Sequence, residues 1–521
     1  MLSLRVLGLG LVLAFATLGR ADSDTEIDYI QSSGTTSTST STSTSTSSSS
    51  TSTSTSSTTV ASATTSTSTS STTSTSAPDG YAAYAVSSAS NGGVTRYLGG
   101  TWHGNTTAAT ETWWVTNRTY TAVAGTAVVG VPPGASKSWD VNLIYSESAL
   151  ASTESCVDHT GSTVSTSLCS ISGSTNRSCT YSIDLTGVHS GLGIVAGSCF
   201  QIQFVATGSP PSQNANAIGI SAKEAGGDGI MAIASSDTGS SSATVYMGLE
   251  GNLTSSTSIF TFIPVVKPVN ACTGMLAMET APGGGGSWTY KVAISTAALG
   301  NTQTCSDLSY TTVDGCTIAG SDKNCRFALN SSMVIPADYC VQLQRVETGS
   351  ATAGGALNWS IECSPDTTET AKAGPPAWFA ATTANLTTVN GNFLMGGHTA
   401  GSSVTGTSSA YWLTGDQAYT KCSGLWSATT TGTATGTVNV TVRYSTSALT
   451  STQSCHTSGA QPSYTETSTL CSLTVGTHKS CTFTDAAVSI PANACMSLKA
   501  TMSGTPSVAP ADGLYSLSCS P

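Results

Sequence analysis

The side chains best suited to chemistry in this 521-residue chain are its 6 histidines, 28 acidic residues and 16 cysteines. A catalytic site needs several titratable groups that converge in space. Glu154 and Asp158 form an isolated acidic pair, and the chain has no Gly-x-Ser-x-Gly, phosphate-loop or His-Glu-x-x-His motif. No histidine recurs at matching positions in all three copies of the repeat described below. We therefore expect no catalytic residue, no metal site, no cofactor and no enzymatic activity.

The cysteines point instead to a framework of disulfide bonds. Their number is even, and the Cys-x-x-Cys pairs that often hold zinc are absent from the sequence. Four cysteines recur in each of three segments of the chain. They are Cys156, Cys169, Cys179 and Cys199; Cys305, Cys316, Cys325 and Cys340; and Cys455, Cys471, Cys481 and Cys495.

Glycine-centred turns predict how these recurrent cysteines pair. Cys169 and Cys179 lie about Gly173, and a hairpin turning at this glycine places them opposite each other on neighbouring strands. The other two cysteines of each segment then pair with one another, and each closed loop stabilises the fold by roughly 2–4 kcal/mol. The expected pairs are Cys169–Cys179, Cys316–Cys325, Cys471–Cys481, Cys156–Cys199, Cys305–Cys340 and Cys455–Cys495.

Two further pairs are expected in the second and third segments only, Cys272–Cys363 and Cys422–Cys519. The first segment has Ala124 and Ala222 at the corresponding places. Loss of both cysteines together is what a bonded pair would show. Each of these disulfides should tie an early strand of its segment to the last one.

Aromatic side chains are the best candidates for ligand binding. Each segment has an aromatic residue ten positions before the column that contains Ala124; these residues are Trp114, Phe262 and Trp412. If they are buried in the core, the neighbouring Trp113 and Tyr411 point to the opposite face. An exposed ring on a sandwich face can stack on a sugar. The alternative for Trp113 and Tyr411 is packing between modules or beneath a loop.

The elements that carry these residues are indicated by a sequence that occurs three times: YSESALASTESC at 145–156, ISTAALGNTQTC at 294–305 and YSTSALTSTQSC at 444–455. Each copy follows a stretch of alternating apolar and polar residues, such as Trp139, Val141 and Leu143. This alternation predicts a strand with one buried and one solvated face. We expect the repeated sequence to form the end of a core strand and its exit turn, with the Ala-Leu pair plugging the end of a sandwich and Ser and Thr satisfying backbone groups.

The repeats divide the chain into three modules of similar length, at 77–224, 225–368 and 369–521. Many short strands, turns rich in Gly, Ser and Pro, and the lack of helical periodicity predict an all-β fold. Each module should be an antiparallel β-sandwich, jelly-roll- or immunoglobulin-like, stapled by disulfides. Because the linkers are short, we expect the modules to form a semi-rigid row.

One stretch resembles a known group of proteins. The run CSISGSTNRSC at 169–179, followed by a strand and by VAGSCFQIQF, is similar to a recurrent β-sandwich module of bacterial secreted and phage-tail-like surface proteins. The resemblance covers the C-terminal half of each module. It implies a role at a surface and transfers no catalytic residue.

The N-terminal region predicts export. Residues 1–21 combine Arg5, an apolar run and small residues at Gly19 and Ala21, as a cleavable secretory signal does. Residues 22–76 form a linker rich in Ser and Thr, which has too few apolar side chains to fold and should be disordered. A net charge of −11 argues against nucleic acid as a partner. We expect an extracellular or cell-surface protein with no membrane span once the signal is removed.

Variable loops suggest where a partner would bind. The loops between the first and second recurrent cysteines differ in length among modules, whereas core strands cannot slip without turning buried side chains outward. Loops carry recognition on many sandwich scaffolds. We therefore expect module-specific contacts at this end, with His159 and His456 exposed there. Candidate ligand-binding residues are thus Trp113, Tyr411, His159 and His456.

These features favour a secreted, non-enzymatic, structural or adhesive repeat protein of the cell surface or extracellular matrix. Its partners would be glycans, another surface protein or further copies of itself. One alternative is a carbohydrate-binding adhesin that uses Trp113 and Tyr411. Another is a secreted hydrolase with a mucin-like linker, which is disfavoured because no module differs in kind from the others.

Overall fold

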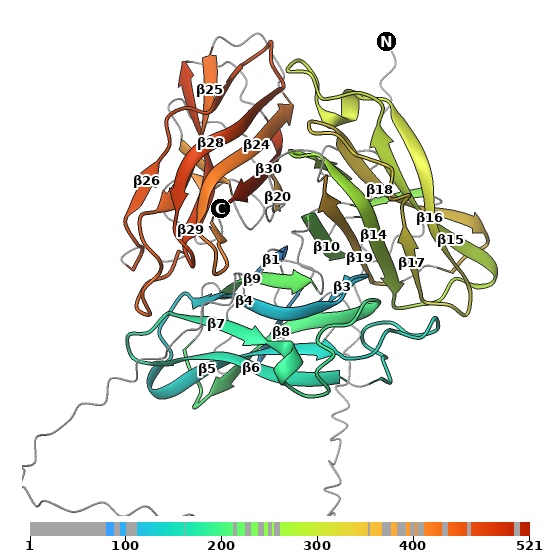
Figure 1. The fold of residues 1–521 in the computed structure, drawn as a ribbon, viewed down its shortest axis with the longest axis horizontal. Coiled ribbons are helices and arrows are strands. Elements are labelled where there is room, and N and C mark those ends of the chain that lie inside the picture. The colour runs from blue at the N-terminus through green and yellow to red at the C-terminus, as the bar shows by residue number, and fades with distance from the viewer. Residues whose placement is uncertain are drawn as a thin grey trace, which may run out of the picture. The chain divides into compact units, whose positions relative to one another are not determined.

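A computed structural model describes residues 80–87, 94–99, 112–161, 163–211, 216–224, 231–237, 244–247, 253–254, 261–352, 355–366, 377–382, 392–395, 402–403, 411–429, 436–455, 460–504 and 511–521 (Figure 1). All of them belong to one compact unit, Thr72–Pro521. The expected signal sequence at 1–21 and linker at 22–76 lie outside the described residues. In the described part of the chain, no helix is long and apolar enough to cross a membrane.

The fold is all-β, as the alternating pattern predicts, and its antiparallel strands form three sets of paired sheets. The strands of the first set, called module 1 below, have sheet orders β1-β9-β4-β7 and β2-β8-β5-β6, with β3 beside β8. They are β1 Gly80–Ser87, β2 Arg96–Leu98, β3 Trp114–Thr116, β4 Tyr120–Val129, β5 Gly134–Ser146, β6 Thr163–Gly173, β7 Ser178–Asp184, β8 Ser198–Thr207 and β9 Asn216–Glu224, with a 3-10 turn at Leu185–Gly187.

The second set, module 2, repeats this topology with orders β10-β19-β14-β17 and β12-β11-β18-β15-β16, and β13 beside β18. Its elements are β10 Met231–Asp237, β11 Thr244–Met247, β12 Leu253–Thr254, β13 Phe262–Pro264, β14 Val269–Met278, β15 Gly283–Ser295, a 3-10 turn at Cys305–Asp307, β16 Tyr310–Gly320, β17 Asn324–Ala328, β18 Cys340–Gly349 and β19 Leu357–Pro365.

The third set, module 3, has the orders β20-β30-β24-β28 and β22-β21-β29-β25-β26, with β23 beside β29 and β27 beside β25. Its strands are β20 Ala377–Thr382, β21 Asn392–Met395, β22 Ser402–Ser403, β23 Trp412–Leu413, β24 Tyr419–Thr429, β25 Gly436–Ser445, β26 Tyr464–Glu466, β27 Cys471–Thr474, β28 Ser480–Ile490, β29 Cys495–Gly504 and β30 Ala511–Ser520.

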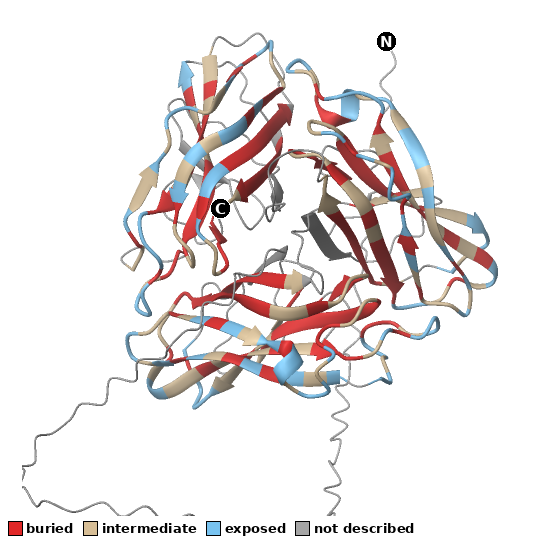
Figure 2. Ribbon diagram, viewed as in Figure 1, coloured by how far each residue is buried: buried red, intermediate tan, exposed pale blue. Residues whose placement is uncertain are grey.

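Each module has its own hydrophobic core between its two sheets. On β5 the alternation works as predicted, because Trp139, Val141 and Leu143 are buried in this core while the residues between them are partly exposed. Strands β14 and β24 differ, because their C-terminal halves are buried on both faces (Figure 2). Their outer faces must therefore be covered by something other than their own sandwich.

All sixteen cysteines are in disulfides, and the bonds are those that the hairpin and internal comparison predict. They are Cys156–Cys199, Cys169–Cys179, Cys272–Cys363, Cys305–Cys340, Cys316–Cys325, Cys422–Cys519, Cys455–Cys495 and Cys471–Cys481. In module 3 the bond Cys422–Cys519 joins directly paired residues of β24 and β30, with 4.0 Å between the Cα atoms.

Module 1 has no equivalent of the disulfides Cys272–Cys363 and Cys422–Cys519, and the positions predicted to correspond to these cysteines are partly wrong. In β4, Val123 rather than Ala124 is paired with Ala222, and both Val123 and Ala222 lie in the module core. Ala124 pairs with Ser221 instead. The equivalents of Cys272 and Cys363 are therefore Val123 and Ala222. The one-residue error arises because the count from the residue paired with the recurrent cysteine differs among modules. It is nine from Leu413 to Cys422 in module 3, but eight from Val115 to Val123 and from Pro264 to Cys272 in modules 1 and 2.

Candidate functional site

The repeated sequence forms a turn at the end of β5, β15 and β25. In all three turns a serine hydroxyl at the strand end donates to the carbonyl two residues later: Ser146 to Ser148 at 2.8 Å, Ser295 to Ala297 at 2.9 Å and Ser445 to Ser447 at 2.9 Å. A carboxylate or amide oxygen then accepts a backbone N–H three residues before it: Glu154 from Ala151, Gln303 from Gly300 and Gln453 from Thr450. We call residues 150–154, 299–303 and 449–453 the docking turns.

The tip of each docking turn binds a hairpin of another module. The carbonyl of Ser152 accepts the N–H groups of Lys323 and Asn324 at 2.6 and 3.2 Å. Asn324 is the first residue of β17, and Lys323 precedes it. The amide side chain of Asn324 donates to the carbonyls of Ala151 and Glu154 at 2.6 and 2.8 Å. We call the hairpins that carry Lys323–Asn324, Lys479–Ser480 and Arg177–Ser178 the receiving hairpins. A turn of module 1 is thus held by module 2.

The other two modules repeat this contact. The Asn301 carbonyl of module 2 accepts the N–H groups of Lys479 and Ser480 of module 3 at 2.7 and 3.1 Å. The Ser451 carbonyl of module 3 accepts those of Arg177 and Ser178 of module 1 at 2.6 and 3.1 Å. The second residue of each hairpin adds a hydroxyl hydrogen bond, from Ser480 to Gly300 and from Ser178 to Thr450.

The three contacts run from module 1 to 2, from 2 to 3 and from 3 back to 1. Each is heterologous, because a turn on one side meets a hairpin on the other, and such contacts form closed sets when the rotation between units closes. The expectation of a row of modules is therefore wrong, since a row would leave modules 1 and 3 without contact. The physical reason is that every module carries both halves of the same contact.

Both kinds of recurrent disulfide support this contact. The bond Cys156–Cys199 holds the chain just after the docking turn of module 1 to the start of β8. The bond Cys169–Cys179 joins the two strands of the hairpin that receives module 3. A disulfide limits the freedom of the segments it joins. Turn and hairpin are thus both restrained at the point where the modules meet.

An apolar cluster lies beside each set of hydrogen bonds. Trp113, Val115, Leu150 and the Cys156–Cys199 bond of module 1 pack on Met275 and Ala277 of β14. The equivalent cluster of module 2 contains Phe262, Val266, Leu299 and Cys305–Cys340 with Leu425 and Leu514 of module 3. That of module 3 contains Tyr411, Leu413, Leu449 and Cys455–Cys495 with Val128 and Ala217 of module 1. These clusters cover the outer faces of β4, β14 and β24.

This packing overturns two expectations. Trp113 and Tyr411 are only 7% and 3% exposed, so neither presents a ring on which a sugar could stack. The leucine that recurs in the three copies, Leu150 in module 1, belongs to the cluster between modules and does not plug the end of its own sandwich. The sequence could not separate these cases, because a ring that faces away from its own core is buried or exposed according to its neighbours.

Strand register also shows which aromatic residues are equivalent. Val115, Pro264 and Leu413 each pair with a recurrent cysteine on the neighbouring strand. Counting two residues back from each gives Trp113, Phe262 and Tyr411 as one column, so module 2 also has an aromatic residue at the position of Trp113 and Tyr411. The expected column of Trp114, Phe262 and Trp412 is therefore wrong at its middle member.

Two junctions add an ion pair beside the turn. Lys323 pairs with Asp158 of module 1, and Lys479 pairs with Asp307 of module 2 at 2.9 Å. Burial alone would raise the pKa of Asp158, but hydrogen bonds from Lys323 and Ser155 bring the pKa below its ordinary value. Both aspartates lie in the variable loop after the first recurrent cysteine, so this loop takes part in contacts between modules.

The junction of modules 1 and 2 has a further polar contact. The Arg118 guanidinium donates to the Ala271 carbonyl at 2.8 Å and to the Ser364 hydroxyl at 3.1 Å. The backbone N–H of Asn117 donates to the buried Glu362 carboxylate at 3.0 Å. A buried carboxylate needs such donors to offset its lost hydration. These groups fix the orientation of module 1 on β19.

His159 is not exposed as expected, because its side chain is only 4% accessible. Its Nδ1 lies 2.9 Å from the Glu154 carboxylate, and its Nε2 lies 2.6 Å from the Ser146 hydroxyl. The arrangement of Glu, His and Ser resembles a catalytic triad in its distances. However, Ser146 is buried and makes the same turn hydrogen bond as Ser295 and Ser445, which have no such histidine partner among the described residues. The expected second exposed histidine, His456, lies outside the described residues.

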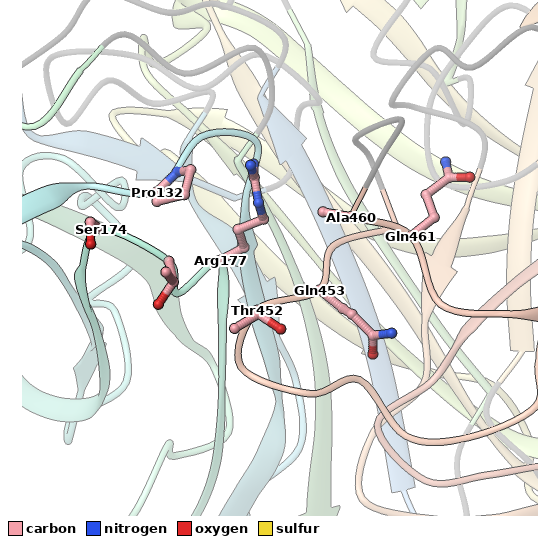
Figure 3. Close-up of a pocket in the computed structure, with 8 residues that line it drawn as sticks. Pro132, Ser174, Arg177, Thr452, Gln453, Ala460 and Gln461 are labelled. Atoms are coloured by element: carbon pink, nitrogen blue, oxygen red, sulfur yellow. The ribbon is translucent and has the colours of Figure 1, made fainter.

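Shallow grooves remain where modules meet. One is lined by Pro132, Ser174, Thr175 and Arg177 of module 1 and by Thr452, Gln453, Ala460 and Gln461 of module 3 (Figure 3). The other, between modules 1 and 2, is lined by Asn117, Arg118, Thr119, Ala196, Ala271, Thr273 and Ser364. The described residues contain no group of three His, Cys, Asp or Glu side chains placed to hold a metal ion. The lack of a metal site in the whole chain stays a prediction.

No known family model matches this chain, and no curated protein matches it either. Among solved structures, it is similar to broad bean stain virus, with 8% identity and a TM-score of 0.16 over 47% of this chain and 76% of that one. It is also similar to naturally occurring empty particles of cowpea mosaic virus, with 11% identity and a TM-score of 0.16 over 55% and 88%. Such low TM-scores carry no argument. The topology of the paired sheets is consistent with a jelly-roll-like β fold, and the resemblance to bacterial secreted and phage-tail-like modules stays a prediction.

Proposed function

We propose that this protein is a secreted, non-enzymatic structural protein of the cell surface or extracellular matrix, whose three modules act as one preassembled unit. A disulfide-rich all-β fold of this kind suggests an extracellular structural protein. In this proposal the Ser/Thr-rich segment 22–76 is a spacer between the modules and their site of attachment.

One observation carries the proposal. The features of the sequence that most resemble a binding site, the repeated turn, its leucine and the aromatic column, are all used to hold the modules to one another. Aromatic residues that would bind a ligand on a separate module are here part of an internal interface. A structural role needs such an interface and does not need a ligand.

The carbohydrate-binding alternative loses its basis, because it depended on exposed rings at Trp113 and Tyr411. In the described part of the chain, the arrangement that best fits the hydrolase alternative is the cluster of Glu154, His159 and Ser146. A nucleophile must be reachable by substrate, and both His159 and Ser146 are covered. We propose that this cluster stiffens the docking turn of module 1.

The proposal is tested by locating the protein in its source cells with an antibody against the three-module unit. We expect it in the insoluble extracellular fraction, with the unit resistant to protease until the disulfides are reduced. Recovery only from the cell interior, or only as a freely soluble secreted protein, would contradict a structural role. Turnover of an ester or glycoside that is lost in Ser146→Ala would contradict the non-enzymatic part.

A further inference from the structure

The junction between modules 3 and 1 shows that docking does not depend on a linker. Modules 1 and 2, and modules 2 and 3, are consecutive in the chain. Modules 3 and 1 are separated in the sequence by the whole of module 2. Even so, the Ser451 carbonyl accepts the same two backbone N–H groups, and Ser178 adds the same kind of hydroxyl hydrogen bond. Recognition therefore resides in the two surfaces, and the surfaces of two separate chains can make the same contacts.

We propose that module 3 also docks onto modules 1 and 2 of a second copy of this chain, so that the protein links to itself by exchanging this module. The exchange deepens the structural role proposed above and rests on it for its purpose. Across the two copies, the Ser451 carbonyl of one would accept from Arg177 and Ser178 of the other. The Lys479–Ser480 hairpin would likewise receive the Asn301 carbonyl.

The length of the connecting segments favours module 3 as the exchanged unit. Eleven residues, 366–376, lie between β19 and β20, whereas six residues, 225–230, lie between β9 and β10. At about 3.3 Å per extended residue, the longer segment reaches roughly 36 Å. Module 3 thus has the longer tether, and a longer tether lowers the effective concentration of a module at the docking site on its own chain.

The charges at the three junctions favour the same module. Asp158 and Asp307 stand two residues after their cysteines, but the same position in module 3 is Thr457, and the sequence from Cys455 to Tyr464 contains no acidic residue. The Arg177 guanidinium donates instead to the Gly130 carbonyl of its own module. In the described part of the chain, the junction of modules 3 and 1 therefore lacks the ion pair that lies beside the docking turn at the other two junctions.

The segment between modules 2 and 3 decides whether module 3 docks on its own chain or on a second chain. A short flexible linker gives the tethered module an effective concentration in the millimolar range, so docking within one chain wins in dilute solution. Shortening a hinge segment removes that advantage and favours exchange between chains. Deleting residues 367–375 from the full chain leaves two residues between β19 and β20, fewer than the six of the equivalent connection between modules 1 and 2.

We expect the shortened chain to have twice the molar mass of the wild-type chain by light scattering. Adding Leu449→Asp, which places a charge in the apolar cluster between modules 3 and 1, should return it to the monomer mass. A monomeric shortened chain would overturn the proposal, whether its module 3 is docked or protease-sensitive. That result would leave the structural role standing, since the role is tested by extracellular location.

A second measurement keeps the proposal testable if the shortened chain fails to fold. Two wild-type samples with different affinity tags are mixed near millimolar concentration, incubated and diluted, and one tag is captured. We expect the second tag to be captured with it, and to be lost when both samples carry Leu449→Asp. Failure of the wild-type tags to co-purify after prolonged incubation would overturn the exchange.

Discussion

Glu154 occupies the position that Gln303 and Gln453 occupy in the other docking turns. Unlike these glutamines, it can titrate. The Thr160 hydroxyl, with the N–H groups of Ala151 and Thr160 and the His159 ring, lowers the pKa of Glu154 from 4.5 to about 2. Because the folded pKa lies below that of the unfolded chain, the ionised carboxylate stabilises the fold at pH values above 4.5. This contribution is lost as the pH falls from 4.5 towards 2.

The variant Glu154→Gln tests this linkage, because glutamine keeps an oxygen for the Ala151 N–H, as Gln303 does for Gly300, but does not titrate. We expect the urea midpoint of the wild-type chain to fall more steeply between pH 5 and pH 2 than that of the variant. The two midpoints should differ most near pH 6 and least near pH 2. Parallel pH profiles would show that Glu154 does not hold the turn through its charge.

Trp113 provides a second prediction at the residue scale. Truncation of a buried tryptophan costs about 3–5 kcal/mol, and Trp113 lies between modules 1 and 2. We expect Trp113→Ala to speed hydrogen exchange at the amides of Lys323 and Asn324, which donate to the Ser152 carbonyl. The matched variant Tyr411→Ala should instead speed exchange at Arg177 and Ser178. Unchanged protection of Lys323 and Asn324 in Trp113→Ala would contradict a role of this ring at the junction.

At the scale of elements, strand register predicts a disulfide that module 1 lacks. Val123 and Ala222 are directly paired on β4 and β9, as Cys422 and Cys519 are on β24 and β30. We expect Val123→Cys with Ala222→Cys to oxidise spontaneously and to stabilise module 1 by about 2–4 kcal/mol. The measurement is thiol titration followed by urea unfolding with and without reductant.

The matched control is Ala124→Cys with Ala222→Cys. Neighbouring residues of a strand point to opposite faces, so these two side chains cannot meet without moving the backbone. The control should keep two titratable thiols and gain no stability. Oxidation of the control but not of the Val123 pair would show that the register of β4 and β9 is shifted by one residue.

The strands and disulfides could be predicted from the sequence because both depend on local spacing. Alternation of Trp139, Val141 and Leu143 indicates a strand wherever its partner lies, and a glycine-centred hairpin places Cys169 opposite Cys179. The docking contact could not be predicted, because its central acceptor is the backbone carbonyl of Ser152 and its donors are backbone N–H groups. Such groups are present in every residue and leave no pattern of residue types.

Burial of the outer faces of the sheets could not be predicted from the sequence for a related reason. The run from Met275 to Met278 is apolar, and an inward-facing and an outward-facing residue alternate along it. Sequence periodicity says which face a side chain occupies, but not whether another module covers that face. A signal was nevertheless present, since an apolar residue at outward positions of β4, β14 and β24 is unusual for a solvated face.

At the scale of the whole molecule, every disulfide joins two cysteines of the same module, so the three modules are linked covalently only by the chain itself. If the three junctions are as stable as their hydrogen bonds and apolar clusters suggest, they should hold the modules together without this link. Protease sites inserted in 225–230 and 367–376 of the full chain allow the link to be cut after folding. We expect the doubly cut protein to migrate as three pieces on a denaturing, non-reducing gel but to keep the molar mass of the intact chain by light scattering under native conditions.

Because each contact closes the set formed by the other two, loss of one should weaken the remaining pair. Leu299→Asp, in the cluster between modules 2 and 3, should therefore release module 3 from the cut protein, while Asp322→Asn, a change outside the three apolar clusters, should not. Separation of the cut wild-type pieces on a native column would show that the chain, and not the repeated junction, keeps the modules together.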